Sequence, residues 1–344
     1  MPRHTRMPLL RLAFAATAGA AALVLLAIRG SAPIAAGGLE EGVQGPKACQ
    51  ECHGPEYSAW EKTHHFASGE LHRSDKAKAI ADKLGLESIR KSETCQQCHY
   101  TVREDAGEVR AKEGVSCESC HGPAQGWVAV HNNYGGEGVK REAEPAEHKA
   151  ARWKAAEEAG MIRPTRLYDL ARNCLSCHTV PDEKLVNVGG HTAGTPFELV
   201  SWSQGEVRHN YTDPATGKPD ANNREATPER KRQMYVLGKI ADLEITLRAM
   251  ALATDAKGVY FTTLATRVAD VKKALGDIQA AQAVPAVAQA LAAVEGLDLS
   301  APNADALNAV ADKLTAAAGT LPDDAALEKL DPLLPKDVKG TPAQ

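Results

Sequence analysis

Apolar residues recur at intervals of three and four along the last third of the chain, a period typical of amphipathic helices. The first of these helices is predicted to begin at Thr227-Pro228, because Thr is a favourable N-cap and Pro fits the first helical position. Three more helices with the same period are expected directly after Gly258, Pro285 and Pro302. Together they predict an antiparallel helical bundle over residues 226–320, followed by a loose, proline-rich tail over residues 321–344.

A continuous apolar run lies near the other end of the chain, between Leu12 and Ile28. Three arginines precede it and small residues follow it, which is the order found in secretory signals. The run is at the lower limit of length for crossing a bilayer, so a retained anchor is the alternative. Residues 1–36 are therefore predicted to be a signal peptide or an N-terminal anchor, and the rest of the chain to be exported.

The segment between the leader and the bundle lacks long helical periods. Short helices and loops are expected here, with one hairpin that turns at Asp105–Glu108 and returns along Val109–Val115. The stretch Asp213–Asn223 is rich in turn-forming residues and indicates a linker. The fold class is thus predicted to be mainly α, with one domain over residues 45–225 and the helical bundle after it.

The composition is that of a globular protein, with 43% hydrophobic and 24% charged residues in a chain of 344. The formal net charge of −4 gives no drive toward nucleic acid, so no nucleic-acid partner is expected. Aromatic residues make up only 4%, which is low for a chain that must fill its own core. Another source of apolar bulk would explain this deficit.

Cysteine and histidine carry the candidate chemistry. The chain has eight Cys and twelve His, and every Cys belongs to a C-x-x-C pair that is followed directly by a His. The four motifs comprise Cys49, Cys52 and His53; Cys95, Cys98 and His99; Cys117, Cys120 and His121; and Cys174, Cys177 and His178. Because C-x-x-C-H is the attachment signature of c-type haem, four covalently bound haem c groups are predicted.

The spacing of the motif has a physical reason. Two residues between the cysteines let one helical turn present both thiols to the two vinyl groups of a porphyrin, and the next residue reaches the iron as its proximal ligand. Four haems would also supply the apolar bulk that the aromatic residues do not. A disulfide framework or zinc sites would not require a His after every pair, so both alternatives are disfavoured.

A second axial ligand for each iron must come from outside the motifs. Apart from His4 in the leader, seven histidines compete for at most four positions, namely His64, His65, His72, His131, His148, His191 and His209. At least three of them are therefore expected to be ordinary surface residues, and His72 and His148, which lie among charged residues, fit that description. The candidate distal ligands are His65, His131, His191 and His209, with Met161 as a weaker candidate.

The chain resembles the tetrahaem cytochrome c-554 family over about residues 45–210. Besides the four motifs, the resemblance rests on Trp60, Thr63 and His65 after the first motif and on the stretch Glu113–Ala124 around the third. It implies a periplasmic electron carrier with three irons that each have two histidine ligands. It also implies a five-coordinate, open iron at the second motif.

The resemblance further implies which histidine serves which motif. Carried over by position, His65 would be the distal ligand at the fourth motif, His131 at the first, and His209 or His191 at the third. The sequence departs from the family pattern because it offers both His191 and His209. One of the two can close the iron at His99, so the open site implied by the family is left undecided.

The predicted function is electron transfer in the periplasm between redox partner proteins, among them a membrane-associated donor or acceptor complex. The main alternative is an enzyme that reduces a nitrogen oxide or oxidises hydroxylamine at one open haem. A C-x-x-C-K site, as in pentahaem nitrite reductases, is absent from the sequence. A third alternative is a haem-bearing docking subunit of a membrane complex, which a retained anchor would favour.

The bundle contains no Cys and no His. It is therefore predicted to be redox-silent, with a role in docking, oligomerisation or covering the haem domain. On this hypothesis, a chain that ends near residue 225 would keep all four haems.

Overall fold

The computed structural model describes Met1 and residues 42–343, except 106 and 215. Apart from Met1, the signal peptide or anchor predicted over residues 1–36 lies outside the described residues. Residues from 42 onward belong to one compact unit. None of the helices in the described part of the chain is both long enough and apolar enough to cross a membrane.

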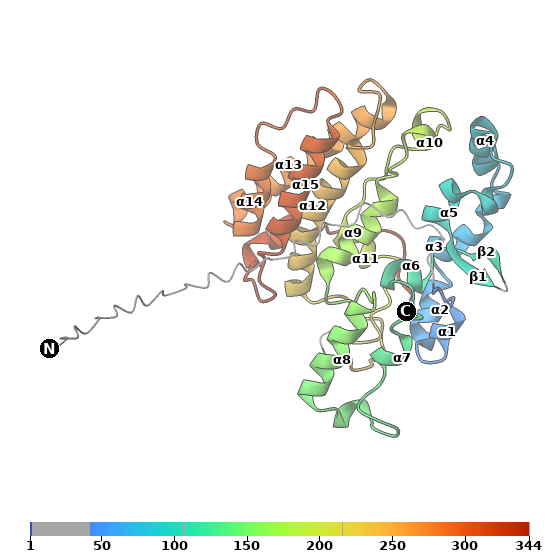
Figure 1. Cartoon of the computed structure of the whole chain (residues 1–344), viewed down its shortest axis with the longest axis vertical. Helices are drawn as coiled ribbons and strands as arrows, with labels where there is room; N and C mark the ends of the chain where they lie inside the picture. Colours follow the sequence, from blue (N-terminus) through green and yellow to red (C-terminus); the bar gives the residue numbers. More distant parts are fainter. Residues whose placement is uncertain (2–41, 106, 215, 344) are drawn as a thin grey trace. The chain divides into compact units, whose positions relative to one another are not determined.

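The fold is mainly helical, as predicted (Figure 1). Short helices and 3-10 turns make up the part of the chain before the bundle. Up to the hairpin they are α1 (Lys47–Gln50), α2 (Gly54–Trp60), α3 (His64–Ala67), η1 (Ser68–Arg73), α4 (Asp75–Leu84), η2 (Ile89–Lys91) and α5 (Glu93–His99). After the hairpin they are α6 (Cys117–His121), α7 (Val128–His131), η3 (Arg141–Ala143), α8 (Ala146–Glu158), α9 (Leu167–His178), α10 (Glu183–Asn187) and α11 (Leu199–Ser203).

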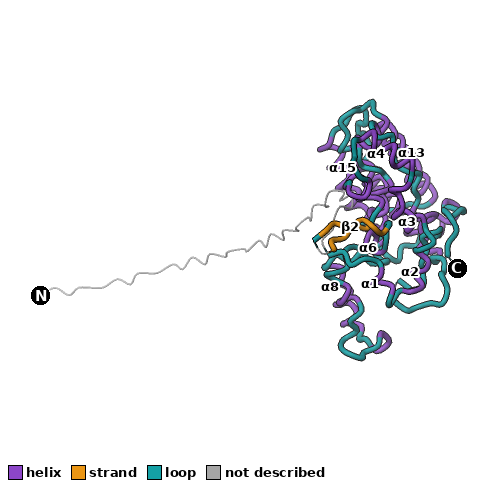
Figure 2. The backbone as a smooth tube through the Cα atoms, turned by 90° about the vertical axis from the view of Figure 1, so that its right-hand side faces the viewer, coloured by secondary structure: helices purple, strands orange, loops and turns teal. Residues whose placement is uncertain are grey.

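The predicted hairpin is present and joins the second motif to the third. Strand β1 (Thr101–Asp105) pairs antiparallel with β2 (Glu108–Glu113), with Thr101 opposite Glu113. These two strands are drawn in orange in Figure 2. Strand β1 begins two residues after His99, the last residue of α5, and β2 ends four residues before Cys117, the first residue of α6. The hairpin therefore brings the C-terminal end of α5 close to the N-terminal end of α6.

The bundle consists of the four predicted helices. They are α12 (Pro228–Met250), α13 (Val259–Ala281), α14 (Pro285–Ala293) and α15 (Ala304–Ala318). Thr227 caps α12 as expected, since its hydroxyl accepts a hydrogen bond from the Arg230 amide at 3.3 Å. The central helix is α12, which packs against α13 and α15 (Figure 1).

One hydrophobic core joins the bundle to α9, the helix that ends in the fourth motif. Leu167 and Leu175 of α9 are buried in the same cluster as Leu243 of α12 and Leu264 of α13. Leu175 has no exposed surface at all. The bundle therefore packs directly on α9, the helix that carries Cys174 and Cys177. Without the bundle, residues 45–225 would lack the side chains that bury the apolar face of α9.

The C-terminal segment departs from the expectation of a loose tail. A short turn, η4 (Glu328–Leu333), buries Leu330 in the same core. Farther along, the Lys339 amide donates to the Ser201 carbonyl at 2.8 Å, and the Ala343 carbonyl accepts from the Asn223 side chain at 2.8 Å. Isolated apolar residues between prolines carry no helical period, which is why the sequence pattern missed this packing.

A carboxylate lies inside the contact between α9 and α12. Glu244 of α12 is fully buried and accepts hydrogen bonds from Tyr168 at 3.0 Å and from Arg172 at 2.7 Å, both on α9. Arg248 donates to it at 2.6 Å and also reaches Asp312 of α15 at 2.8 Å. A buried charge is tolerated only when it is paired and hydrogen-bonded, and here α9 and α12 supply the partners of Glu244.

Replacing Glu244 by Ala is expected to lower the free energy of unfolding by about 3–5 kcal/mol, because it leaves the half-buried Arg172 without its carboxylate and the buried Arg248 with Asp312 alone. Urea denaturation followed by circular dichroism measures the loss. Asp270 is the matched control, since it is an exposed carboxylate on α13 and its replacement by Ala removes the same charge. Equal effects of the two substitutions would contradict a structural role for Glu244.

Candidate functional site

The four C-x-x-C-H motifs occupy helix ends, so each presents its thiols and imidazole from one tight turn. The first motif begins in α1 and places His53 at the N-cap of α2. The other three end on the last residue of a helix, namely His99 in α5, His121 in α6 and His178 in α9. No disulfide joins any two of the eight cysteines, all of which lie in the described part of the chain.

Each motif histidine faces one of the four histidines predicted as distal ligands. The ring centroids are 6.3 Å apart for His53 and His131, 6.3 Å for His65 and His178, 6.3 Å for His99 and His191, and 6.2 Å for His121 and His209. The interplanar angles vary from 25° to 83°, so the four pairs share a distance but not a mutual orientation. The same centroid distance in four separate histidine pairs indicates that the four pairs meet the same geometric requirement.

That distance fits one metal atom between the two rings. A metal–nitrogen bond of about 2 Å on each side, plus about 1 Å from each nitrogen to its ring centre, separates the centroids by about 6 Å. The centroids of rings stacked face to face in direct contact lie closer together than this. Rings with no common partner would have no reason to repeat the same centroid distance four times. Each pair also offers only two nitrogens, whereas a structural zinc ion takes four protein ligands.

The structure places His191 and His209 at different motifs, a choice that the sequence left open. His209 faces His121 of the third motif, and His191 faces His99 of the second. The family resemblance implied an open position at His99, and in this chain His191 lies across from it. His65 and His131 lie at the motifs to which they were assigned by resemblance.

The remaining candidates do not face a motif histidine in any of the described ring contacts. They lie beside carboxylates: His64 bonds Glu206 at 2.6 Å, His148 bonds Glu144 at 2.7 Å, and His72 lies 4.0 Å from Glu70. This placement agrees with the expectation that at least three of the seven are ordinary polar side chains.

The outer nitrogens of the paired rings are held by the surrounding chain. The Nδ1 atoms of four paired histidines lie next to backbone carbonyls: His121 at Ile162 (2.9 Å), His131 at Val128 (2.6 Å), His191 at Thr192 (2.9 Å) and His209 at Val207 (2.7 Å). Donation from Nδ1 leaves Nε2 as the free nitrogen and fixes the orientation of the ring, as is usual for metal-binding histidines. Sequence reasoning did not find these partners, because most are backbone atoms.

Burial keeps several of these imidazoles neutral. It lowers the pKa of His99, His121 and His178 to about 4, and it also lowers the pKa of His131. His53 differs, since the Glu56 carboxylate, 3.7 Å from its Nδ1 atom, raises its pKa. Metal binding requires the neutral form, so burial prepares most of these rings to act as ligands near pH 7.

Comparison with known proteins bears on the same segment. Residues 48–122, which contain the first three motifs, match the family described as "Cytochrome c554 and c-prime". The chain is similar to cytochrome c-554. A curated protein of that name from Nitrosomonas europaea is 27% identical over 104 residues, which are 27% of this chain and 43% of the relative. The similarity thus spans less than half the length of that relative, and no solved structure matches the chain.

The similarity to a c-type cytochrome supports covalently bound haem c and electron transfer as the chemistry of the matched segment. The fourth motif and the whole bundle lie outside residues 48–122. The contribution of the fourth motif and of the bundle therefore follows from this chain's own structure.

The four motifs lie side by side in an order that differs from their order in the sequence. The side chains of Cys49 and Cys117 interact, which raises the pKa of Cys49 and places the first motif beside the third. Asn173 of α9 donates to the Ser119 carbonyl at 2.7 Å, joining the third to the fourth. Cys177 then contacts Cys98, joining the fourth to the second. These contacts link the motifs in the order first, third, fourth, second, and the hairpin also brings Thr101, two residues after the second motif, within 2.7 Å of Ser119 in the third.

Several arginines next to the histidine pairs fit the negative charge that haem c brings. Arg163, Arg208 and Arg267 each have a buried side-chain nitrogen without a hydrogen-bond partner in the described part of the chain. Arg163 follows Ile162, the partner of His121, and Arg208 precedes His209. Since buried cations require an acceptor, these nitrogens are suited to hold the propionate groups of a porphyrin.

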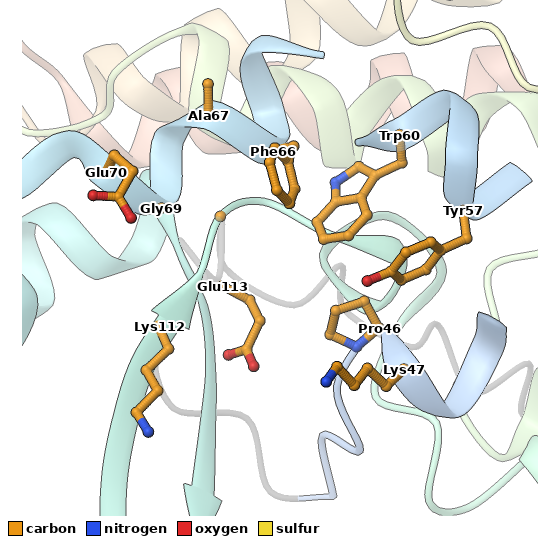
Figure 3. A pocket seen from close by; sticks show the side chains of 11 residues that line it. Pro46, Lys47, Tyr57, Trp60, Phe66, Ala67, Gly69, Glu70, Lys112 and Glu113 are labelled. Atoms are coloured by element: carbon orange, nitrogen blue, oxygen red, sulfur yellow. The ribbon is translucent and has the colours of Figure 1, made fainter. Parts of the chain in front are cut away.

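Trp60, one of the residues that carried the family resemblance, has a structural role. It lines a cavity of about 200 Å³ with Tyr57 and Phe66, while Lys47 and Glu113 lie at its edge (Figure 3). Its indole nitrogen donates to the Val115 carbonyl at 2.7 Å and so ties α2 to the loop before the third motif. The cavity is smaller than most small-molecule sites.

Two other residues of the resembling stretch hold the first and third motifs together. A Cβ atom on Gly114 would lie 2.2 Å from the His65 carbonyl oxygen, so only glycine allows α3 to approach this closely. The buried Glu118 accepts from the amides of Gln44 at 2.9 Å and Gly45 at 2.6 Å, just before the first motif. These contacts place His65 and Cys49 relative to the third motif.

Proposed function

We propose that this chain is a periplasmic tetrahaem c-type cytochrome that transfers electrons between redox partner proteins. The four C-x-x-C-H motifs would each attach one haem c, whose iron supplies one-electron chemistry when bound. The observation that carries the proposal is the repeated separation of 6.2–6.3 Å between each motif histidine and a distal histidine.

In this proposal the chain's own residues position the cofactors and limit access to them. Cys49, Cys95, Cys117 and Cys174 with their partners fix each porphyrin covalently. His53, His99, His121 and His178 are the proximal ligands, and His131, His191, His209 and His65 are their respective distal ligands. The contacts between motifs support a continuous electron path in the order first, third, fourth, second.

The enzymatic alternative requires one iron with a free position for a nitrogen oxide or hydroxylamine. The ring of His191, 6.3 Å from His99, disfavours it at the second motif, where the family resemblance implied such a position. A donor or acceptor protein is therefore the favoured partner, and a membrane-associated redox complex fits an exported carrier. The bundle lies outside residues 48–122, the segment that matches the family, and offers a surface on which a redox partner can dock.

The proposal is tested by the mass of the mature protein. Four covalent haem additions and no free thiol are expected, because all eight cysteines would form thioethers. Intact-mass spectrometry before and after thiol alkylation measures both quantities, and replacing Cys117 and Cys120 together by Ala should remove one haem. Three or fewer haems in the wild-type protein, or a disulfide between any of these cysteines, would contradict the proposal.

A further inference from the structure

We propose that Arg267 of the bundle is a positioning residue for the fourth motif and raises the reduction potential of the iron bound at His178. This inference rests on the proposed function, since it concerns the haem expected at Cys174 and Cys177. It assigns to the bundle a redox role that the absence of Cys and His from its sequence argued against.

A short chain of contacts connects Arg267 with the imidazole of His178. The Nδ1 atom of His178 lies 3.0 Å from the Thr195 hydroxyl, and the Thr195 amide donates to the His178 carbonyl at 2.9 Å. Arg267, on α13, donates from Nη1 to the Thr195 carbonyl at 2.5 Å. The loop residue Thr195 is thus bonded to the motif on one side and to the bundle on the other.

The hydrogen bond to Thr195 distinguishes His178 from His121, His131, His191 and His209, whose Nδ1 atoms lie beside backbone carbonyls. Its partner is a side-chain hydroxyl, whose direction depends on how the loop is held. Phe197 of the same loop and Trp202 of α11, which follows it, pack on the imidazole with ring centroids 4.9 Å and 4.7 Å away. Displacement of the loop would therefore change both the hydrogen bond and the packing around the proximal ligand.

Arg267 also brings a charge into a poorly solvated place. Its side chain is 13% exposed and its Nε donates to Asp242 of α12 at 2.6 Å, while Thr246 donates to the same carboxylate at 3.2 Å. The Nη2 atom is buried and has no hydrogen-bond partner among the described residues. The guanidinium charge is thus held close to the fourth motif, with Thr195 as the residue that bonds both Arg267 and the His178 imidazole.

The sign of the effect on the iron follows from electrostatics. A nearby positive charge disfavours the ferric state, which carries one more positive charge than the ferrous state, and so raises the reduction potential. Loss of the arginine charge should lower the potential, and loss of the Asp242 charge should raise it. Opposite signs for two bonded partners are not expected from mere loosening of the structure.

The test is a potentiometric titration of the four-haem protein, followed by visible absorption. In Arg267→Gln, one of the four components should become about tenfold harder to reduce, a downward shift of about 59 mV for one electron. Asp242→Asn should shift the same component upward, and Arg267→Lys should retain most of the wild-type potential. His65→Ala should make the iron at His178 high-spin, because it removes the ring that faces His178. When Arg267→Gln is added to His65→Ala, the potential that shifts should be that of the high-spin iron, which identifies the fourth motif.

Arg232→Gln is the matched control. Arg232 of α12 is also a buried arginine bonded to an aspartate, with its Nε 2.7 Å from Asp331, but its partner does not contact a motif histidine in the described structure. Its replacement should lower stability and leave all four potentials unchanged. If Arg267→Gln and Asp242→Asn shift the component in the same direction, or shift none while all four haems are present, the inference is wrong and the proposed function stands. Fewer than four haems in the wild-type protein would instead overturn the proposed function.

Discussion

Replacing His191 by Ala should convert one of four low-spin irons to high spin and open it to small ligands. In the native protein the His191 ring lies 6.3 Å from that of His99, a distance that suits a shared iron. Its Nδ1 atom lies 2.9 Å from the Thr192 carbonyl, so its other nitrogen is free to bind. Without the ring, the position opposite His99 would be exposed to water, nitric oxide or carbon monoxide.

Electron paramagnetic resonance of the oxidised protein would measure the change, since it separates high-spin from low-spin iron. One quarter of the iron should change its signal in His191→Ala, and the reduced variant should bind nitric oxide at one site whereas the wild-type protein binds none. His72→Ala is the control, because His72 lies beside Glu70 and faces no motif histidine. A wild-type protein that already contains one high-spin iron, unchanged by His191→Ala, would restore the open site implied by the family and with it the enzymatic alternative.

The features that could be predicted from the sequence are those set by local chemistry. The helices of the bundle follow from an apolar period, and α12 begins at the Thr227-Pro228 signal because N-capping involves only neighbouring residues. The hairpin between β1 and β2 likewise follows from a short link with turn residues. The attachment residues are predicted for the same reason, since each motif is complete within five positions.

The distal ligands depend on contacts between distant parts of the chain, and the sequence could restrict them only to a set. His191 and His209 lie in similar loops, and nothing in their immediate neighbours tells which one faces His99. The fold decides, because the loop after α10 lies at the second motif and the one after α11 at the third. Family resemblance supplied the positions of His65 and His131, which periodicity alone would not give.

The sequence was least informative about polar groups inside the protein. Glu244 and Arg267 occur on helices rich in charged residues, where a carboxylate or guanidinium usually marks the solvated face. In the structure Glu244 is fully buried against α9, and Arg267 reaches the loop beside His178. Such residues look alike in sequence whether they face water or another charged group. The packing of α9 on α12 reveals Glu244, and the contacts of α13 with α12 and Thr195 reveal Arg267.

A chain that ends at residue 225 should fail to keep its fourth haem site, contrary to what the absence of Cys and His from the bundle suggests. Leu167 and Leu175 of α9 are buried in the core that the bundle completes. Exposing two leucines costs about 3–6 kcal/mol, a large part of the 5–15 kcal/mol that stabilises a typical domain. Arg172 would also lose Glu244, and Thr195 would lose Arg267.

We expect the shortened protein to carry fewer than four haems, or to aggregate, with the loss at the fourth motif. Peptide mass mapping after proteolysis measures haem at each motif separately. The first motif serves as the internal control, because none of its residues belongs to the core around α9 and it is held by Glu118 through the Gly45 amide. Residues 226–344 produced as a second chain should restore the fourth site, because the missing surface is supplied by packing and not by a ligand. If the shortened chain instead retains four low-spin haems and unfolds cooperatively, the shared core is dispensable and the bundle is a separate module whose only remaining role is toward a partner.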